Sequence, residues 1–349
     1  MKKIIIIIAA AFILTSCTEV LLGPEPENTP QSNFEILWKT FDENYPLFGV
    51  KNINWDSLHT FYASKISSST SENELWNITA DLLLNLNDGH VKLYNKGYTD
   101  GISGSRMINR KLYDFSLELV KSKFLTEIKT AGDGYFIYGK VKQSLSAVNL
   151  GYIFISTFMA SNSGNGYEWA NDINNILNEF SGCDGIIIDV RNNGGGMKIT
   201  GQIIASAFVD REITYLYQQE KNGPGHNDFG SPIALTVSPG TVTFNKNIAL
   251  LTNRFSASGS EHFAQVLKNL PYSKQIGDTT FGAFGDIINN AQLPNGWGFA
   301  YPCRLTTTPD GKCPEGIGII PDFLVENTKN DITAGKDKVM DYAINFLNK

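Results

Sequence analysis

The sequence predicts an α/β protein with a separate helical domain at its N-terminal end. Between residues 33 and 90, apolar residues recur at helical spacing. From residue 151 onward, short apolar runs alternate with segments of helical period, which is the pattern of a sheet that helices cover on both faces. The chain of 349 residues is also long enough for roughly two domains.

The chain begins with a processing signal and a tether. Two lysines precede an apolar run from residue 4 to residue 14, which is too short to cross a bilayer but typical of a secretory signal. Cys17 directly follows a small-residue cleavage site, so we expect residues 1–16 to be removed and Cys17 to carry a lipid, with an ordinary signal peptide as the alternative. Thr18 favours outer-membrane attachment. Residues 17–32 are polar and proline-containing, which indicates a tether.

Residues 33–90 are predicted to form the helical domain. Its three amphipathic segments carry aromatic and leucine stripes, which are most simply core contacts. The stripes are Phe34, Leu37, Trp38, Phe41 and Tyr45; Trp55, Leu58, Tyr62 and Ile66; and Leu75, Ile78, Leu82 and Leu86.

Residues 91–349 are assigned to the catalytic core, with residues 91–150 as a mixed connecting region. Within that region, Val91–Tyr94 and Tyr135–Val141 resemble strands. The strands predicted beyond it are Tyr152–Phe158, Gly185–Val190 and Asn247–Thr252, and the helices are Trp169–Phe180, Ile199–Phe208, one starting near Ser258, and Asp331–Leu347.

Charge and cysteines restrict the function. The net charge of −6 argues against nucleic acid as a partner. Cys183 precedes a buried strand and is expected to be an inert thiol. Cys303 and Cys313 flank a turn, and both a disulfide and two free thiols remain open. No Cys/His spacing is typical of a metal site, so we expect no metal and no cofactor.

Ser258 is the candidate nucleophile. It lies between the predicted strand Asn247–Thr252 and the helix that follows. At such a junction, the free N–H groups and the positive end of the helix dipole can stabilise a developing oxyanion. Ala257 and Gly259 leave the hydroxyl uncrowded. Helix capping, which serine also does well, is the alternative role for Ser258.

A glycine run supplies a candidate oxyanion cradle. Asn193 and the three glycines 194–196 follow a buried strand and allow the backbone to approach a ligand closely. The spacing is neither that of a dinucleotide-binding turn nor that of a P-loop. A plain tight turn is the alternative. We predict that the N–H groups of Gly195 and Gly259 form the oxyanion pair.

His90 and Glu315 are the candidate base and its orienting carboxylate. His90 follows Gly89, which can end the preceding helix, and Glu315 stands on a rigid backbone between Pro314 and Gly316. A structural histidine and a solvated loop glutamate are the respective alternatives. The other histidines receive no catalytic role: His59, His226 and His262.

Together these segments resemble the C-terminal processing and tricorn-type serine peptidases, whose catalytic core has a ClpP/crotonase-like spiral βαβ architecture. The segments are Phe34–Leu58, Asp88-Gly89-His90, Ile188–Gly196, Ser256–Glu261, Thr280-Phe281-Gly282 and Glu315–Asp322. The processing branch of the family uses a lysine base, but Ala283 stands at that position here. The tricorn-type branch matches His90 and Glu315 instead. The resemblance therefore implies Ser258 as nucleophile, His90 as general base and Glu315 as orienter, without a PDZ domain.

We therefore predict a lipid-anchored envelope serine peptidase that hydrolyses peptide bonds in protein or peptide substrates. The alternative is a catalytically silent lipoprotein that binds a ligand or peptide on the same fold, which the missing lysine favours. Acyl-CoA chemistry ranks last, because an exported protein has no obvious supply of CoA. Residues 210–232 and 283–298 are expected to be loops that shape the substrate pockets.

Overall fold

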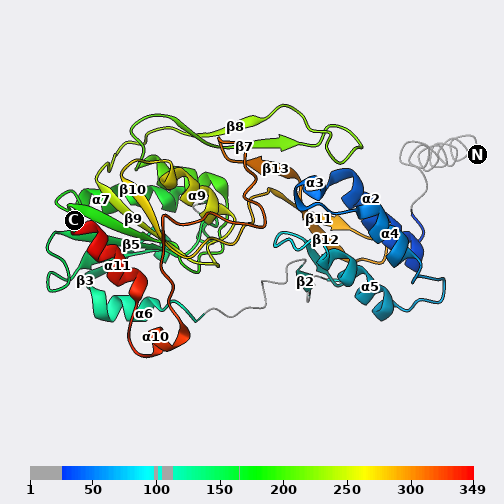
Figure 1. The fold of residues 1–349 in the computed structure, drawn as a ribbon, viewed down its shortest axis with the longest axis horizontal. Coiled ribbons are helices and arrows are strands. Elements are labelled where there is room, and N and C mark those ends of the chain that lie inside the picture. Colours follow the sequence, from blue (N-terminus) through cyan, green and yellow to red (C-terminus); the bar gives the residue numbers. More distant parts are fainter. Residues whose placement is uncertain (1–25, 98–100, 104–112, 165) are drawn as a thin grey trace, which may run out of the picture.

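The structure is a computed structural model that describes residues 26–97, 101–103, 113–164 and 166–349 (Figure 1). The predicted signal peptide and Cys17 lie outside the described residues. A sheet covered by helices forms one lobe, and the N-terminal helices with a smaller sheet form the other. The predicted α/β class with N-terminal helices is confirmed.

A seven-stranded mixed sheet is the centre of the larger lobe. Its strands run in the order β14 (Phe323–Leu324), β10 (Ser273–Gly277), β9 (Asn247–Thr252), β6 (Gly185–Asp189), β5 (Leu150–Ile155), β4 (Phe136–Val141) and β3 (Leu125–Ala131). Strands β5, β6, β9, β10 and β14 pair in parallel, whereas β4 and β3 are antiparallel. The carboxyl ends of the parallel strands therefore meet at one edge of the sheet.

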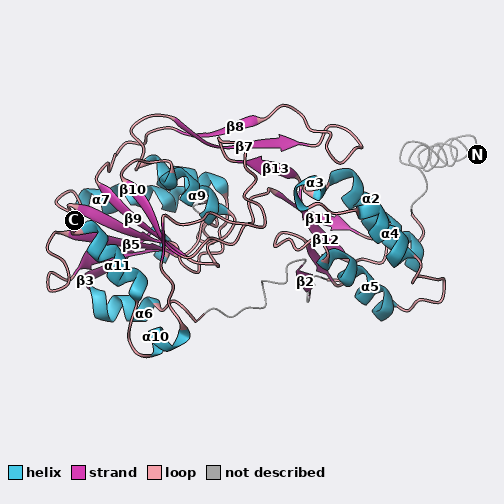
Figure 2. Cartoon of the chain, in the orientation of Figure 1, coloured by secondary structure: helices cyan, strands magenta, loops and turns pink. Residues whose placement is uncertain are grey.

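Helices cover both faces of this sheet, as Figure 2 shows. One face packs against α7 (Asp172–Glu179), α8 (Lys198–Ser206), α9 (Gly259–Lys268) and the 3₁₀ turn Glu168–Asn171. The other packs against α11 (Lys338–Leu347) and the segment formed by α6 (Leu117–Leu119) and the π-helical turn Val120–Phe124. Alternate residues of β6 follow this division: Ile186 and Ile188 face the first cluster, and Ile187 faces the second.

The smaller lobe contains α2 (Pro30–Asn44), α3 (Phe48–Lys51), α4 (Trp55–Ala63) and α5 (Glu72–Leu84). Capping side chains begin α2 and α5: Thr29 accepts from the Ser32 amide, and Ser71 forms a capping box with Glu74. The helices pack on a four-stranded sheet of order β11 (Ile287–Gln292), β12 (Gly298–Pro302), β1 (Lys92–Tyr94) and β2 (Gly101–Ser103). The helical segment thus completes its core with residues far along the chain.

A third sheet of order β13-β7-β8 extends along the top of the view in Figure 1. Its strands are β7 (Ile213–Glu220), β8 (Ile233–Val237) and β13 (Arg304–Thr307). The expectation of loops at 210–232 and 283–298 is wrong where β7 and β11 occur. Strand β11 is mostly exposed, and its apolar and polar residues do not alternate in the way that predicts a strand.

The C-terminal segment corrects a second expectation. The helix predicted over Asp331–Leu347 is divided into α10 (Lys329–Thr333) and α11, because Gly335 takes a φ of 69° and Asp337 then caps α11. Cys183 is a buried thiol, as predicted, and Cys303 and Cys313 are free thiols. Among the described residues, no helix has the length and apolar character that a membrane span requires.

Candidate active site

Ser258 occupies a strained position at the start of α9. It follows the turn after β9 and has φ 55° and ψ −118°, a conformation that a residue with a side chain rarely adopts. Its amide donates to Glu261 Oε2 at 3.0 Å. Residues 259–267 of the helix are buried, whereas Ser258 is partly exposed. The strained backbone thus places the partly exposed Ser258 hydroxyl at the N-terminal end of a buried helix.

The glycine run lies directly against this serine. A Cβ on Gly195 would lie 2.4 Å from Ala257 O, 2.6 Å from Gly259 N and 2.9 Å from Ser258 Cβ. Asn193 holds the two segments together, because its carbonyl accepts from the Ala257 amide and from the Ser260 hydroxyl. The structure therefore brings the predicted Ser258, Gly195 and Gly259 together.

One predicted donor atom is corrected. The Gly195 N–H already donates to Asn193 Oδ1 at 2.9 Å, so this amide is not free to bind an oxyanion. The Gly196 amide is better placed. Residues 195 and 197 pair with Phe158, which turns the N–H of Gly196 away from that segment. A Cβ on Gly259 would lie 3.0 Å from Gly196 N.

Glu261 connects Ser258 to the segment 280–283, a contact that sequence reasoning missed. Besides the Ser258 amide, its carboxylate accepts from the Thr280 hydroxyl at 2.6 Å and from the amides of Gly282 and Ala283 at 2.7 and 2.8 Å. The Ser-x-x-Glu spacing of a capping box was the available signal. The Ala283 side chain is 2 % exposed, so the lysine position is filled by a buried methyl group.

His90 and Glu315 lie together on the other side of the same segment. Their nearest donor and acceptor atoms are within 4.8 Å of each other. Glu315 is 4 % exposed, and its Oε2 accepts from the amides of Phe284 and Gly285 at 2.7 and 3.2 Å. His90 Nδ1 and Glu315 Oε1 are both buried, and neither has a hydrogen-bond partner among the described residues. Glu315 is therefore not the solvated loop residue of the alternative interpretation.

Four consecutive amides join the two halves of the site. The N–H groups of residues 282 and 283 point to Glu261, and those of residues 284 and 285 point to Glu315. His262 Nε2 bonds to Phe284 O at 2.9 Å and so fixes the same segment. Glu261, which binds the Ser258 amide, and Glu315, which lies near His90, are thus both bonded to one short stretch of backbone.

Burial favours the neutral forms of His90 and Glu315. Desolvation lowers the pKa of His90, with the nearby Asp88 opposing this effect. Desolvation raises the pKa of Glu315 well above its ordinary value, and the charge of Asp88 adds to the increase. Burial likewise raises the pKa of Glu261 to about 7 and lowers that of His262 to about 4.

Asp88, His90 and Glu315 form the one group of potential metal ligands found among the described residues. The Asp88 carboxylate is already occupied, because it accepts from the Tyr45 hydroxyl at 2.7 Å and the His90 amide at 2.8 Å and lies 3.5 Å from Lys51 Nζ. A cation would compete with the Lys51 ammonium group. The cluster therefore suits proton transfer better than metal binding.

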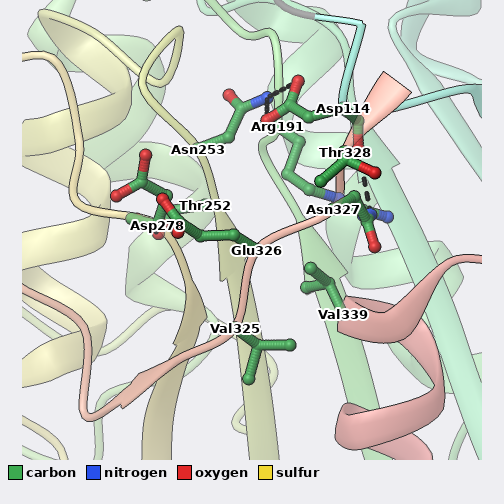
Figure 3. A pocket seen from close by; sticks show the side chains of 10 residues that line it. All are labelled: Asp114, Arg191, Thr252, Asn253, Asp278, Val325, Glu326, Asn327, Thr328 and Val339. Atoms are coloured by element: carbon green, nitrogen blue, oxygen red, sulfur yellow. Dashed lines mark hydrogen bonds between the residues drawn. The ribbon is translucent and has the colours of Figure 1, made fainter. Parts of the chain in front are cut away.

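A polar cavity of about 170 Å³ lies where β6, β9 and β10 end (Figure 3). Asn253 donates to the Asp114 carboxylate there and also to Asn192 Oδ1. Below it, the buried Arg191 guanidinium pairs with Asp189 and Asp337 at 2.7 and 2.9 Å. These contacts anchor the end of β6, from which the chain turns into the glycine run.

Comparison with known proteins gives consistent matches. Residues 149–325 match the model of peptidase family S41, and residues 26–83 match the tricorn protease C1 domain. A carboxyl-terminal-processing protease of Synechocystis sp. is 29% identical over 215 residues, which are 60% of this chain and 47% of the relative. Tricorn protease of Thermoplasma acidophilum is 31% identical over 180 residues, 49% of this chain and 15% of the relative. The matches thus span less than half of these relatives.

A solved structure matches over nearly its full length. The crystal structure of a protein from Parabacteroides merdae, described as a peptidase, superimposes with a TM-score of 0.82 at 30% identity. The match covers 93% of this chain and 98% of that one. The helical lobe and the sheet lobe are therefore shared with that protein.

Proposed function

The chain belongs to peptidase family S41, and from this membership we propose that it is a serine peptidase in which Ser258 attacks, His90 acts as general base and Glu315 orients His90. The observation that supports this best is a pair of buried atoms in one small cluster, His90 Nδ1 and Glu315 Oε1, which find no hydrogen-bond partner within the part of the chain that the structure describes. Each is the partner that the other lacks. A buried donor and acceptor left unpaired are costly, so the pair closes when substrate orders the site.

The reaction follows from these positions. Ser258 Oγ attacks the peptide carbonyl carbon while His90 Nε2 accepts the hydroxyl proton. The imidazolium then forms, and Glu315 Oε1 accepts a hydrogen bond from its Nδ1–H. His90 passes the proton to the leaving amine as the C–N bond breaks. Water then hydrolyses the acyl-enzyme by the same proton route, which restores the Ser258 hydroxyl.

The oxyanion is assigned to the amides of Gly259 and Gly196. Gly259 is the first residue of α9, so its N–H adds to the positive end of the helix dipole. Gly196 replaces Gly195 in this role because the Gly195 N–H is engaged by Asn193. Loss of one such donor is expected to lower kcat by about 10²–10³.

We extend the proposal to the location of the protein in the cell. The signal-like start and Cys17 support an envelope protein anchored by lipid to a membrane, with the outer membrane favoured by Thr18. Cys17→Ala is expected to abolish labelling by a radioactive fatty acid. Continued labelling of that variant would remove the anchor from the proposal.

The test of catalysis compares wild-type protein with Ser258→Ala on an unstructured protein such as casein. We expect hydrolysis by the wild type, a loss on the order of 10⁶ in the variant, and stoichiometric labelling of Ser258 by a fluorophosphonate. Ser181→Ala is the matched control, because Ser181 is an exposed serine in the turn between α7 and β6. Equal hydrolysis by wild type and Ser258→Ala contradicts the proposal.

A silent binding protein is the second candidate, because Ala283 removes the lysine used by the processing branch. It predicts no fluorophosphonate labelling of Ser258 and no hydrolysis. Labelling of Ser258 eliminates it.

A further inference from the structure

A buried charged cluster stands behind the proposed base, and the mechanism above does not use it. Asp88, at the end of α5, is 1 % exposed, and its carboxylate lies within 4.8 Å of atoms of both His90 and Glu315. Asp88 Oδ1 accepts from the His90 amide, which fixes the backbone on which the imidazole is mounted. Asp88 is therefore hydrogen-bonded to the backbone of His90, and its charge lies close to the carboxylate of Glu315.

Donors hold Asp88 in place from two other elements. Burial and the Asp88 charge raise the pKa of Tyr45 well above its ordinary value, so the Tyr45 hydroxyl keeps its proton and donates to Asp88 Oδ2. Lys51 Nζ donates to the carbonyls of Leu86 and Asn87 at 3.1 Å each and lies 3.5 Å from Asp88 Oδ2. The cluster thus contains two carboxylates and one ammonium group.

The carboxylates of Asp88 and Glu315 differ in their hydrogen-bond partners. Asp88 is surrounded by donors, whereas Glu315 has an unpartnered Oε1 and no cation bonded to it among the described residues. Two carboxylates at this distance disfavour each other's ionised form. A proton retained by the pair therefore belongs on Glu315, and Glu315 must lose it before it can stabilise an imidazolium.

We propose that Asp88 and Lys51 are positioning residues of opposite effect, which together set the pH at which the Glu315–His90 pair becomes competent for catalysis. This inference rests on the proposed peptidase function, since it assigns the control of the same base. Neither residue touches the substrate in this scheme. They act through charge on Glu315 and His90.

The sign follows for each residue. The Asp88 charge raises the pKa of both Glu315 and His90, and the Lys51 charge lowers both. Without the Asp88 charge, the Glu315–His90 pair therefore reaches its catalytically competent protonation state at lower pH. Without the Lys51 charge, it reaches that state only at higher pH. The other charged or titratable groups that act on the pair remain in both variants: Lys92, Glu261, His262, Asp286, Cys313 and Tyr45.

The first experiment measures kcat/KM against pH for wild type, Asp88→Asn and Lys51→Met. We expect the acidic limb to move down by about 1 pH unit in Asp88→Asn and up by about 1 unit in Lys51→Met. Asp81→Asn on α5 and Lys39→Met on α2 are the matched controls, because both residues are exposed, and their profiles are expected to equal that of the wild type. Lys51→Arg keeps the positive charge, so the acidic limb of its pH profile is expected to stay at the wild-type position.

The second experiment does not depend on turnover. In the Ser258→Ala background, the His90 imidazole is titrated by NMR, with its signal assigned through His90→Gln. The midpoint is expected to fall in Asp88→Asn and to rise in Lys51→Met. Lys51 is partly exposed at its end, so Lys51→Met keeps the fold testable if Asp88→Asn does not fold.

The outcomes separate the two proposals. If the wild-type protein hydrolyses nothing while the His90 midpoint shifts in opposite directions in Asp88→Asn and Lys51→Met, the peptidase function is excluded but the role of the charge cluster is supported. Hydrolysis combined with unshifted limbs and midpoints, or with shifts of the same sign in both variants, overturns the role of Asp88 and Lys51. Activity loss without any change of limb or midpoint identifies a merely structural role and also overturns it.

Discussion

Gly195→Ala is expected to disable the site while its neighbour Gly194→Ala does not. Gly195 has φ 95°, and the added Cβ would lie 2.4 Å from Ala257 O and 2.6 Å from Gly259 N. At Gly194 nothing lies within 4 Å of the added atom, and φ is not positive. The two substitutions add the same methyl group at adjacent positions of one turn, so they differ in what the methyl meets and in the backbone conformation of the residue that carries it.

The expected magnitude follows from these distances. A carbon atom keeps about 3.5 Å from non-bonded neighbours, so the backbone of Ala257 to Gly259 must move by about 1 Å to admit the methyl group. A displacement of about 1 Å in a reacting group costs on the order of 10² in rate. The left-handed backbone adds a loss of roughly 1–2 kcal/mol in the free energy of unfolding.

The assay combines kcat/KM on a peptide substrate with urea denaturation. We expect Gly195→Ala to lose about 10² in kcat/KM, while Gly194→Ala stays within about twofold of the wild type. The free energies of unfolding give the fraction of each variant that is folded, and so show whether the loss of kcat/KM is larger than partial unfolding explains. Near-normal activity of Gly195→Ala, or equal damage by both substitutions, would falsify the close approach of the glycine run to Ser258.

Three further predictions concern the buried carboxylates. Glu315→Gln keeps an acceptor for the amides of residues 284 and 285 but cannot neutralise an imidazolium, so kcat is expected to fall by about 10³–10⁴ with little change in KM; a kcat near the wild-type value would exclude the orienting role. Burial raises the pKa of Glu261 from 4.5 to about 7, so its contribution to stability is present below pH 4.5 and is lost as the pH rises to about 7. In Glu261→Gln, urea denaturation between these pH values should therefore show a decline smaller by about 3 kcal/mol, and an unchanged decline contradicts this pKa. Asp337→Ala leaves the buried Arg191 with Asp189 alone and is expected to lower the free energy of unfolding by about 3–5 kcal/mol, whereas a loss under about 1 kcal/mol, measured by the same method, would show that the guanidinium is compensated elsewhere.

Local patterns predicted most of the regular elements. The stripes of α2, α4 and α5 and the apolar runs of β5, β6 and β9 bury one side or both, so their period is visible in the residues themselves. Strand β11 escaped prediction because its residues are mostly exposed. The division between α10 and α11 escaped because Gly335 interrupts a periodicity that otherwise continues.

The sequence predicted that Ser258 and the glycine run lie close together, but it did not predict every backbone contact between them. The strand-to-helix junction predicted Ser258, and the glycine run predicted a close backbone approach. Neither pattern could show that the Asn193 side chain occupies the Gly195 amide, because that bond depends on the detailed turn geometry. The role of Glu261 was only partly predictable. The Ser-x-x-Glu spacing indicates its bond to the Ser258 amide, but its other three donors belong to the distant segment 280–283.

By itself, the sequence determined the α/β class, the helical segment before it, and a hydroxyl placed at the start of a helix beside flexible backbone. These depend on interactions within a few residues, which leave a readable period or spacing. Tertiary structure alone decided that polar atoms of His90, Glu315 and Asp88 lie within 4.8 Å of one another, that Lys51 lies beside Asp88, and that the N-terminal helices complete their core with β11 and β12. Contacts between distant segments depend on how whole elements pack, and no local pattern records them.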